Sequence, residues 1–343
     1  MGSGKTTATR QAAQQLISKN IKTGIITNDQ GNKLVDGGLF KHLNIPNREV
    51  VDGCFCCNYG ELDTNISSLV AEAGAEIIFA ESVGSCTDIV ATVLKPLLKF
   101  RTETQVTVST FADARLLQMM LGNGAKAFDE SVRYIYFKQL EEASVIVINK
   151  IDLINEDELA LLRTIIVKKY GDKILLFQNS NDKQHIEKWI DVLNAHDGFI
   201  PINSLDIDYD LYAAGEANLA WVDQEIELFS ADGNGMQEAA LLIANIFKAI
   251  KEKNYVIGHL KFLINNSIKI SLTSPGDQLP SIDFKPCNSV DLLINMRVQT
   301  LPENVTSLIA DAILQTELDT GCRIAIMSSA AFQPGYPSPE HRL

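Results

Sequence analysis

The first residues that could do chemistry stand at the start of the chain. The opening run Met1-Gly2-Ser3-Gly4-Lys5-Thr6-Thr7 matches the second half of the phosphate-binding pattern G-x-x-x-x-G-K-[ST]. Glycines there let backbone N–H groups approach phosphate oxygens, Lys5 would reach the β and γ phosphates, and the Thr6 hydroxyl would bind Mg²⁺. A flexible Gly/Ser segment before an ordinary helix is the alternative. The nucleotide-site residues predicted here are Gly2, Ser3, Gly4, Lys5, Thr6 and Thr7.

Two later groups could complete that site, because each follows a predicted strand. In Ala80-Glu81-Ser82-Val83-Gly84, the Glu81 carboxylate could order the Mg²⁺ shell or an attacking water, and the Gly84 amide could contact the γ phosphate. In Asn28-Asp29-Gln30-Gly31, Asp29 could make a switch-like contact to Mg²⁺. An acidic turn and an ordinary Asx turn are the respective alternatives. The predicted catalytic residues are Lys5, Asp29, Glu81 and Gly84.

The run Asn149-Lys150-Ile151-Asp152 follows an apolar strand and has the residue types of a guanine site. The Asp152 carboxylate can accept hydrogen bonds from guanine N1–H and from the exocyclic amine, an arrangement that adenine does not offer. Asn149 would bridge the base and the phosphate loop, and the Lys150 stem would lie over the ring. A capped strand-to-helix turn is the alternative. Because the run lies downstream of a phosphate loop, it favours GTP, with a further backbone contact to the base near Asn179-Ser180-Asn181.

The segment Gly53-Cys54-Phe55-Cys56-Cys57-Asn58 places three thiols within four residues. If the segment is extended, Cys54 and Cys56 share a face and a turn could bring Cys57 round, which leaves at least one position for another ligand. Such an incomplete set suits a transferable metal, and thiolates favour Zn²⁺ or Cu(I), with Co²⁺ and Ni²⁺ also conceivable. Inert buried cysteines and a redox pair are the alternatives. The remaining cysteines are isolated and are interpreted as packing residues: Cys86, Cys287 and Cys322.

Alternating strands and helices must position these groups. The predicted strands are Thr23–Thr27, Glu76–Ala80, Gln105–Ser109, Ser144–Ile148 and Ile174–Phe177. The predicted helices are Lys5–Lys19, Ile89–Phe100, Glu130–Leu140, Glu156–Tyr170 and Lys183–Ala195. This alternation predicts an α/β fold of the P-loop NTPase kind, with a mostly parallel sheet covered on both faces.

A change of pattern follows the last of these helices. The stretch Asp197–Glu216 mixes Gly, Pro, Asn and Asp without periodicity, so we predict an irregular domain boundary there. Beyond it, the predicted strands are Trp221–Phe229, Tyr255–Leu263, Ser267–Leu272, Val290–Val298 and Arg323–Ser328, with helices at Met236–Lys253 and Glu303–Thr316. Their order resembles a split βαβ layout, which predicts a smaller α+β domain. The predicted domains are residues 1–200 and 215–343.

Composition narrows the class of partner and the compartment. With 343 residues, 46% of them hydrophobic, the chain can bury two cores. Its net charge of -13 disfavours nucleic acid and anionic membranes as general partners. No run approaches the roughly 18 apolar residues of a membrane span, and the N-terminus lacks a signal-peptide pattern. Because crowded cysteines are typical of thiolate chemistry in a reducing compartment, we predict a cytoplasmic protein.

Taken together, the motifs resemble those of the CobW/HypB/UreG family of P-loop GTPases, over roughly the first 200 residues. The matching runs are Gly4-Lys5-Thr6-Thr7, Gly53-Cys54-Phe55-Cys56-Cys57, Glu81-Ser82-Val83-Gly84, Gln139-Leu140-Glu141-Glu142-Ala143 and Asn149-Lys150-Ile151-Asp152. The resemblance implies a GTPase that uses GTP and Mg²⁺, binds Zn²⁺ (or Co²⁺ or Ni²⁺) at its Cys-x-Cys-Cys motif and delivers it to a client enzyme or cofactor pathway. It also implies that the second domain, similar to CobW C-terminal domains, contributes to client contact. A homodimer is compatible with it.

The sequence also departs from the family pattern. The family's first strand and the leading glycine of its phosphate loop are expected just before Met1, so the chain is expected to begin inside the motif. A missing central strand would expose the edges of its neighbours. Two further hypotheses therefore remain. One is a nucleotide-dependent activator of a partner such as a corrinoid protein, with structural zinc at the cysteines, and the other is an inactive fragment.

Overall fold

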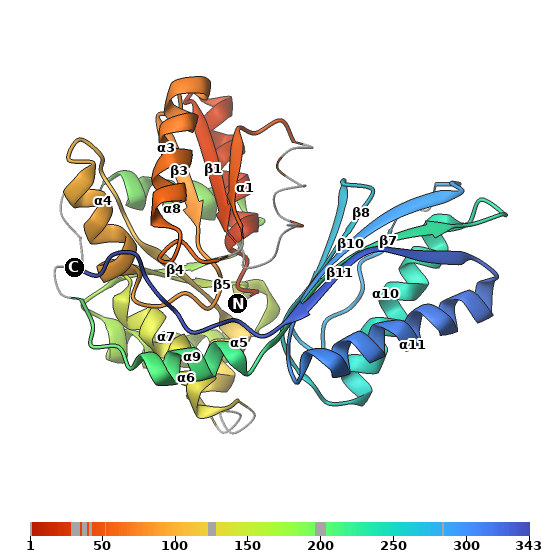
Figure 1. Cartoon of the computed structure of the whole chain (residues 1–343). Coiled ribbons are helices and arrows are strands. Elements are labelled where there is room, and N and C mark those ends of the chain that lie inside the picture. The colour runs from red at the N-terminus through yellow and green to blue at the C-terminus, as the bar shows by residue number, and fades with distance from the viewer. Residues whose placement is uncertain are drawn as a thin grey trace.

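The computed structural model describes residues 2–28, 35, 40, 43–51, 53–122, 128–195, 204–282 and 285–343. Two parts are evident in Figure 1. The first consists of parallel strands with helices around them, and the second is a curved antiparallel sheet with two helices on one face. The polypeptide returns to the first part after its last strand, so that the C-terminus lies beside α4 (Figure 1).

Two three-stranded parallel sheets form the centre of the first part. Their strand orders are β2 (Asn47–Val50), β1 (Thr23–Asn28), β3 (Ile77–Glu81) and β4 (Ser109–Asp113), β5 (Val145–Asn149), β6 (Ile174–Gln178). No ladder joins β3 to β4 among the described strands. Thr27 pairs with Glu81, and Asp113 pairs with Asn149, so the polar residues that end these strands are in register. The predicted α/β fold with mostly parallel strands is confirmed.

Helices cover these sheets and hold them together. They are α1 (Lys5–Ser18), α3 (Tyr59–Ala73), α4 (Lys95–Phe100), α5 (Ala114–Leu121), α6 (Glu130–Glu142), α7 (Glu156–Tyr170), α8 (Lys183–Asn194) and α9 (Tyr209–Ala217), with a π-helical turn η1 (Val90–Leu94) before α4 and a 3₁₀ turn η3 (Ile151–Leu153) after β5. In α1, Ala8, Ala12 and Leu16 recur every four residues and pack into the core beneath both sheets. The ring of Trp189 in α8 contacts Phe79 of β3 and Phe111 of β4, with centroids 5.7 and 5.1 Å away. One aromatic side chain thus bridges the two sheets.

Two sequence-based expectations are wrong. The strand predicted at Gln105–Ser109 lies four residues later, as β4, because Phe111 and Ala112 are the buried apolar residues whereas Gln105 is exposed. The stretch Asp197–Glu216, predicted to be irregular, contains α9, whose first turn is capped by the Asp208 carboxylate. The domain limits stay a prediction.

The second part has the layout that the sequence predicts. Its elements are β7 (Ala220–Phe229), α10 (Gly235–Glu252), β8 (Val256–Ile264), β9 (Ile268–Leu272), β10 (Ser289–Gln299), α11 (Pro302–Thr320) and β11 (Arg323–Phe332). All neighbours are antiparallel in the order β11-β7-β10-β8-β9. Leaving aside the edge strand β9, this is the split βαβ order, so that prediction is confirmed.

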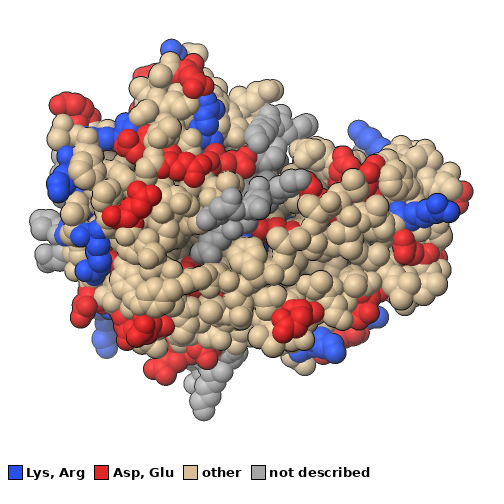
Figure 2. All heavy atoms as spheres, in the orientation of Figure 1, with Lys and Arg blue, Asp and Glu red and all other residues tan. Residues whose placement is uncertain are grey.

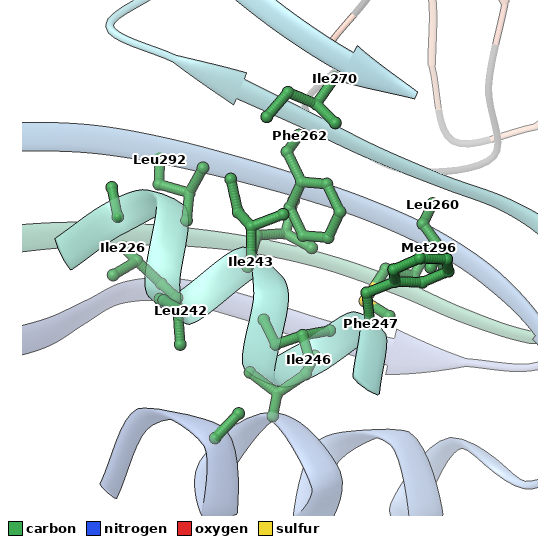
Figure 3. Packing of buried hydrophobic residues seen from close by; sticks show 14 of the residues in the cluster. Ile226, Leu242, Ile243, Ile246, Phe247, Leu260, Phe262, Ile270, Leu292 and Met296 are labelled. Atoms are coloured by element: carbon green, nitrogen blue, oxygen red, sulfur yellow. The ribbon is translucent and has the colours of Figure 1, made fainter. Parts of the chain in front are cut away.

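The second part has opposite chemistry on the two faces of its sheet. Leu242, Ile243 and Ile246 of α10 point into a cluster with Phe262 and Leu292 from the strands (Figure 3). Because side chains alternate along a strand, Asn295 and Arg297 of β10 lie on the other face. That face is turned away from α10 and α11 and toward the first part.

Acidic residues outnumber basic ones in the chain, 43 to 30. On the face shown in Figure 2, acidic groups are spread over both parts, and the basic groups among the described residues form no continuous patch. No helix within the described residues is long and apolar enough to cross a membrane.

Candidate functional site

A cavity of about 320 Å³ lies where the two parts meet. From the first part it is lined by the segment Gly2–Thr7, by the ends of β1 and β3, and by Lys150. From the second part it is lined by Trp221, His259, Lys261, Lys269, Asn295 and Arg297. Several of these side chains are basic, so the cavity offers a polyanion a favourable electrostatic environment in a chain that is acidic overall.

The opening glycines form a tight loop ahead of α1. Gly2 and Gly4 have φ angles of 61° and 87°, in the left-handed region that glycine tolerates best. A Cβ atom on Gly4 would lie 2.4 Å from Asn149 Nδ2, so a side chain has no room there. Since α1 begins at Lys5, its first N–H groups and its positive dipole end face the cavity. This geometry suits a phosphate group.

Thr6, Glu81 and Lys5 come together at the floor of the cavity. The Thr6 hydroxyl donates a hydrogen bond of 2.8 Å to Glu81 Oε1, and Lys5 Nζ lies 4.0 Å from the same oxygen. A hydroxyl and a carboxylate are hard oxygen ligands of the kind that Mg²⁺ prefers. Ser3 Oγ and Thr27 Oγ1 also line the cavity, and neither buried oxygen has a hydrogen-bond partner among the described residues. The donor set therefore fits Mg²⁺ together with phosphate oxygens.

The predicted base site is partly assembled. Asn149 Nδ2 donates to Ser3 O at 2.7 Å, and Asn149 Oδ1 accepts from the backbone N–H and the hydroxyl of Ser180 at 3.0 and 2.9 Å. The expected bridge from Asn149 to the phosphate loop is therefore present. Asp152 is exposed in η3 and is not part of the cavity lining.

Lys150 has an ionic partner that the sequence did not suggest. Its backbone is left-handed, with φ 63°, and Nζ lies 2.8 Å from Asp113 Oδ2 and 3.1 Å from Thr273 Oγ1. Burial opposes ionisation of Asp113, but the nearby charges of Lys150 and Arg115 outweigh it and hold the pKa of Asp113 below its ordinary value. Lys150 therefore connects the end of β5 with Asp113 in the first part and with Thr273 in the second part.

The three clustered cysteines form a turn rather than an extended segment. The N–H groups of Cys57 and Asn58 both donate to Cys54 O at 3.0 Å. Distances between sulfurs are 2.7 Å for Cys54 and Cys56, 3.4 Å for Cys54 and Cys57, and 3.7 Å for Cys56 and Cys57. Thiolates about 2.3 Å from a tetrahedral zinc lie roughly 3.8 Å apart, so the closest pair would open by about 1 Å on binding. The trio fits a thiophilic metal.

Contacts between the thiols shift their pKa values in opposite directions. Contact with the Cys56 thiol, and then with Cys57, holds the pKa of Cys54 below its ordinary value. The same contact with Cys54, and then contact with Cys57, raises the pKa of Cys56.

Asn28 connects the cysteine turn with the cavity. Its side chain is buried, lines the cavity at the end of β1, and donates to Val50 O at 3.0 Å and to Gly53 O at 2.6 Å. Its Oδ1 accepts from the N–H of Phe55 at 3.0 Å. A single amide thus contacts the backbone on both sides of Cys54. The next residue, Asp29, which was predicted to contact Mg²⁺, lies outside the described residues.

Gly84, for which a γ-phosphate contact is predicted, lines the cavity and leads into a buried segment. Gln139 Nε2 donates to Gly84 O at 3.0 Å and to Cys86 O at 2.8 Å. Cys86, interpreted from the sequence as a packing residue, is buried in the same core cluster as Cys54 and Cys56.

The C-terminal residues lie over the cysteine turn, which the sequence did not predict. The N–H of Ser338 donates to Cys57 Sγ at 3.4 Å, and the N–H of Glu340 donates to Cys56 O at 2.9 Å. His341 packs edge-on against Tyr59, with ring centroids 5.0 Å apart, and Arg342 Nε donates to Asp88 Oδ2 at 2.7 Å. We call residues 338–342 the C-terminal strap.

The basic wall from the second part was also missed. His259 and Lys261 are two residues apart on β8, and Lys269 and Ser271 are two apart on β9. That alternation could have shown that one face of this sheet is polar, but not what it faces.

Comparisons with known proteins bear on the first part. Residues 1–175 match a protein-family model described as the nucleotide-binding domain of CobW/HypB/UreG. Among solved structures, the chain is similar to HypB from Helicobacter pylori, crystallised in complex with nickel, with 15% identity, 60% of this chain and 87% of that chain covered, and a TM-score of 0.42. A hydantoinase/carbamoylase family amidase from Burkholderia ambifaria matches with 10% identity, 45% of this chain and 41% of that chain covered, and a TM-score of 0.23. Such low TM-scores add nothing to the family match.

Proposed function

We propose, on the premise that the chain belongs to the CobW/HypB/UreG family, that it is a cytoplasmic GTPase whose nucleotide cycle controls a transition-metal ion held by Cys54, Cys56 and Cys57. The ion is the cargo, destined for a metal-requiring client protein or a cofactor-synthesis enzyme. Zn²⁺, Co²⁺ and Ni²⁺ all suit three thiolates.

On this proposal the floor of the cavity handles the triphosphate. The backbone of Gly2–Thr7 cradles phosphate oxygens, Lys5 neutralises the β and γ phosphates, and Thr6 turns its hydroxyl from Glu81 toward Mg²⁺. Mg²⁺, when bound, withdraws charge from the γ phosphate. Glu81 is then free to order the Mg²⁺ shell or the attacking water, and Gly84 contacts the γ phosphate. Asp29 remains the predicted switch contact.

We assign the guanine base to the region at the end of β5, around Asn149. Asn149 already joins the phosphate loop to Ser180, so it fixes the rim on which a base would rest. Lys150 would lie along the ring, and Asp152 would turn in from solvent to accept the two guanine N–H groups. The purified protein should therefore hydrolyse GTP in preference to ATP, and equal rates or none would remove the guanine assignment.

The observation that carries the proposal is the position of Asn28. Because this side chain lines the nucleotide cavity and holds both Gly53 and Phe55, any movement of the end of β1 reaches the cysteine turn directly. Segments next to the γ phosphate are ordered by GTP and released by hydrolysis in P-loop proteins. Metal binding and release would alternate accordingly.

Replacing Asn28 tests this connection. In Asn28→Ala, GTP binding and metal binding should each still be measurable. A non-hydrolysable GTP analogue, however, should no longer alter the metal affinity of this variant. Asn65→Ala is the matched control, since Asn65 Nδ2 makes a similar bond of 3.1 Å to Glu49 O away from the cysteine turn. If the Asn28 variant responds to nucleotide as the wild type does, coupling does not pass through this side chain. Metal affinity that is unchanged in Cys56→Ser/Cys57→Ser would remove the metal role altogether.

A second candidate function is nucleotide-dependent activation of a partner, such as a corrinoid protein, with structural metal at the cysteines. The C-terminal strap favours it, because a covered site suits a metal that stays in place. Metal retained through a full round of GTP hydrolysis in the presence of a chelator would support this alternative against the metallochaperone.

A further inference from the structure

The turn that follows β9 contacts two predicted nucleotide-binding residues of the first part. We call residues 273–277 the β9 turn, which Thr273 begins. The Thr273 hydroxyl accepts a hydrogen bond of 3.1 Å from Lys150 Nζ. Its methyl group lies against Gly2, because a Cβ atom on Gly2 would approach Thr273 Cγ2 to 2.3 Å. One side chain of the second part thus contacts both the phosphate loop and the proposed base site.

The β9 turn is held in shape by its own last residue. Asp277 Oδ2 accepts hydrogen bonds from the backbone N–H groups of Thr273 and Ser274, at 2.7 and 3.0 Å. Asp277 Oδ1 accepts from Arg115 Nη1, at the start of α5, at 2.7 Å. Burial opposes ionisation of Asp277, but the N–H of Thr273 and the Arg115 guanidinium outweigh it and hold the pKa of Asp277 below its ordinary value. The turn is therefore closed by its own bonds and attached to the first part by an ion pair.

Four charged side chains and the Thr273 hydroxyl form a closed ring between the two parts. Asp113 Oδ2 lies 2.8 Å from Lys150 Nζ and 3.4 Å from Arg115 Nη2. The ring continues from Lys150 to Thr273, from Thr273 to Asp277 and from Asp277 to Arg115. Because the four charged side chains are only 4–27% exposed, solvent screens the ring less than it screens a surface ion pair. The Lys150 ammonium is therefore held between the two parts.

The anchored ammonium determines where the stem of Lys150 lies. Lys150 lines the cavity, and its Cε is 4.0 Å from the position that a Cβ atom on Gly4 would take. The stem thus lies beside the phosphate loop, where its methylene groups offer an apolar surface to a flat ring. Thr273 is not part of the cavity lining, so it would act on a ligand only through the residues that it contacts.

We propose that Thr273 and Asp277 are positioning residues of the nucleotide site, which hold Lys150 in the orientation in which its stem supports the guanine base. This rests on the proposed function, since it names further residues of the same site. Ordering a free lysine side chain costs conformational entropy, so a stem that is already in place raises affinity for the base. Recognition of the base by the first part therefore depends on the second part, whereas recognition of the phosphates does not.

Thr273→Val removes the hydroxyl and keeps a methyl group against Gly2. In the presence of Mg²⁺, affinity of the full chain for a non-hydrolysable GTP analogue should fall about 10-fold, because a hydrogen bond to a charged group is lost. Affinity for inorganic triphosphate, which has no base, should be unchanged. Thr273→Ser retains the hydroxyl and should bind the analogue as the wild type does. Thr306→Val is the matched control, because its hydroxyl donates to Pro302 O within α11 at 3.0 Å, and it should change neither affinity.

A double-mutant cycle shows whether the effect passes through Lys150. Lys150→Ala should itself weaken binding of the analogue, and addition of Thr273→Val to it should have no further effect. The same 10-fold loss in both backgrounds would contradict the positioning role. Equal losses of affinity for the analogue and for inorganic triphosphate in Thr273→Val would also contradict it, because the phosphate loop itself would then be disturbed.

The remaining outcomes separate this proposal from the proposed function. If the wild type binds the analogue and Thr273→Val binds it equally well, the positioning role fails while the proposed function stands. Tighter binding in Thr273→Val would show that the β9 turn competes with the base, and would overturn the proposal. If the wild type does not bind the analogue, the proposed function fails as well.

A second variant tests the proposal if circular dichroism shows that Thr273→Val does not fold. Asp277→Asn keeps an oxygen for the N–H of Thr273 but removes the charge that pairs with Arg115. It should weaken binding of the GTP analogue and leave binding of inorganic triphosphate unchanged. Unchanged affinity for the analogue in this variant would refute the role of the β9 turn.

Discussion

The interior of the second part differs from the region around the strand ends of the first part. Between α10, α11 and its sheet, the second part encloses one continuous apolar cluster. The buried groups near the strand ends of the first part are instead polar or thiol-bearing, among them Thr6, Asn28, Cys54 and Asp88. A buried polar group costs free energy unless it has a partner. The contrast indicates that the strand ends of the first part retain groups for ligands, whereas the apolar cluster stabilises the second part.

The two parts meet through polar contacts. Arg115 Nη1 lies 2.7 Å from Asp277 Oδ1, and the N–H of Val35 donates to Asn295 Oδ1 at 2.9 Å. Within the second part, Arg297 stacks on Trp221 and pairs with Asp223 at 3.0 Å. This polar face forms one wall of the cavity, so the second part also contributes to the site.

The largest change in stability is expected in the second part. Ile243→Ala should lower the free energy of unfolding by about 2–5 kcal/mol, because it leaves a cavity in the apolar cluster. GTP affinity, measured by titration on the folded variant, should be unchanged. Leu318→Ala is the control, since that side chain is 73% exposed on α11. Equal losses of stability in both variants would contradict the contrast between the parts.

Gly4→Ala should have the opposite profile, because it should weaken GTP binding more than it lowers stability. A left-handed alanine costs about 1–2 kcal/mol, and the new Cβ also meets Asn149 Nδ2 at 2.4 Å. Displacing the loop should weaken GTP binding by at least about 100-fold, which is about 2.7 kcal/mol. Gly321→Ala has the same strain, with φ 76° and nothing within 4 Å of its Cβ, so it should cost stability alone. Comparable loss of GTP affinity in both variants would exclude the steric explanation.

Glu142 makes the stability of the first part depend on pH. Burial, and then the charge of Asp88, raises the pKa of Glu142 to about 8, against 4.5 ordinarily. Between these values the native state holds a proton that the unfolded state has released, so stability falls as pH rises and the loss is complete above pH 8. From pH 6 to pH 8 the fall should be about 2 kcal/mol.

Denaturant unfolding at several pH values measures this dependence. Glu142→Gln should flatten it while keeping an oxygen for the N–H of Ile89, 3.2 Å away. Glu141→Gln, at the neighbouring position, should keep the wild-type slope. Identical slopes in all three proteins would show that Glu142 is not the titrating group.

The smallest effect concerns the C-terminal strap. Arg342→Ala removes the ion pair with Asp88, but Arg342 is 45% exposed and Asp88 keeps its bond with the Tyr209 hydroxyl, so stability should fall by only about 1 kcal/mol. Release of bound Zn²⁺ to a chelator should nevertheless become faster, because the strap lies over Cys56 and Cys57. Arg323→Ala, on the exposed edge of β11, should leave the release rate unchanged. The same rate in Arg342→Ala would exclude a covering role.

The features of the fold and site that could be predicted from the sequence depend on residues that are close together in the chain. The spacing of Gly4, Lys5 and Thr6 predicts a loop and a helix start, and the strand patterns before Glu81 and Asn149 predict strands there. The structure has this helix and these strands, while the roles of the residues stay a prediction. The elements of the second part follow from strict alternation and from amphipathic helices. The local pattern did not place β4 correctly, because the burial of Phe111, rather than β-propensity, determines where this strand lies in the sequence.

The features that could not be predicted depend on contacts between residues that are far apart in the sequence. Ser338 contacts Cys57 from 281 positions away, and Lys261 lines the cavity from another sheet. None of these has a local signature, because each depends on how separate elements pack. Asp152 illustrates the converse: its motif is local, yet its side chain is exposed.

The most direct test of the coupling between the two sites is reciprocal titration. Zn²⁺ affinity is measured with and without a non-hydrolysable GTP analogue, and affinity for the analogue is measured with and without Zn²⁺. If the cavity and the thiols form one unit, each ligand should change the other's dissociation constant by the same factor, of about 5-fold or more. If both affinities are indifferent to the other ligand, the sites are independent and the account is wrong.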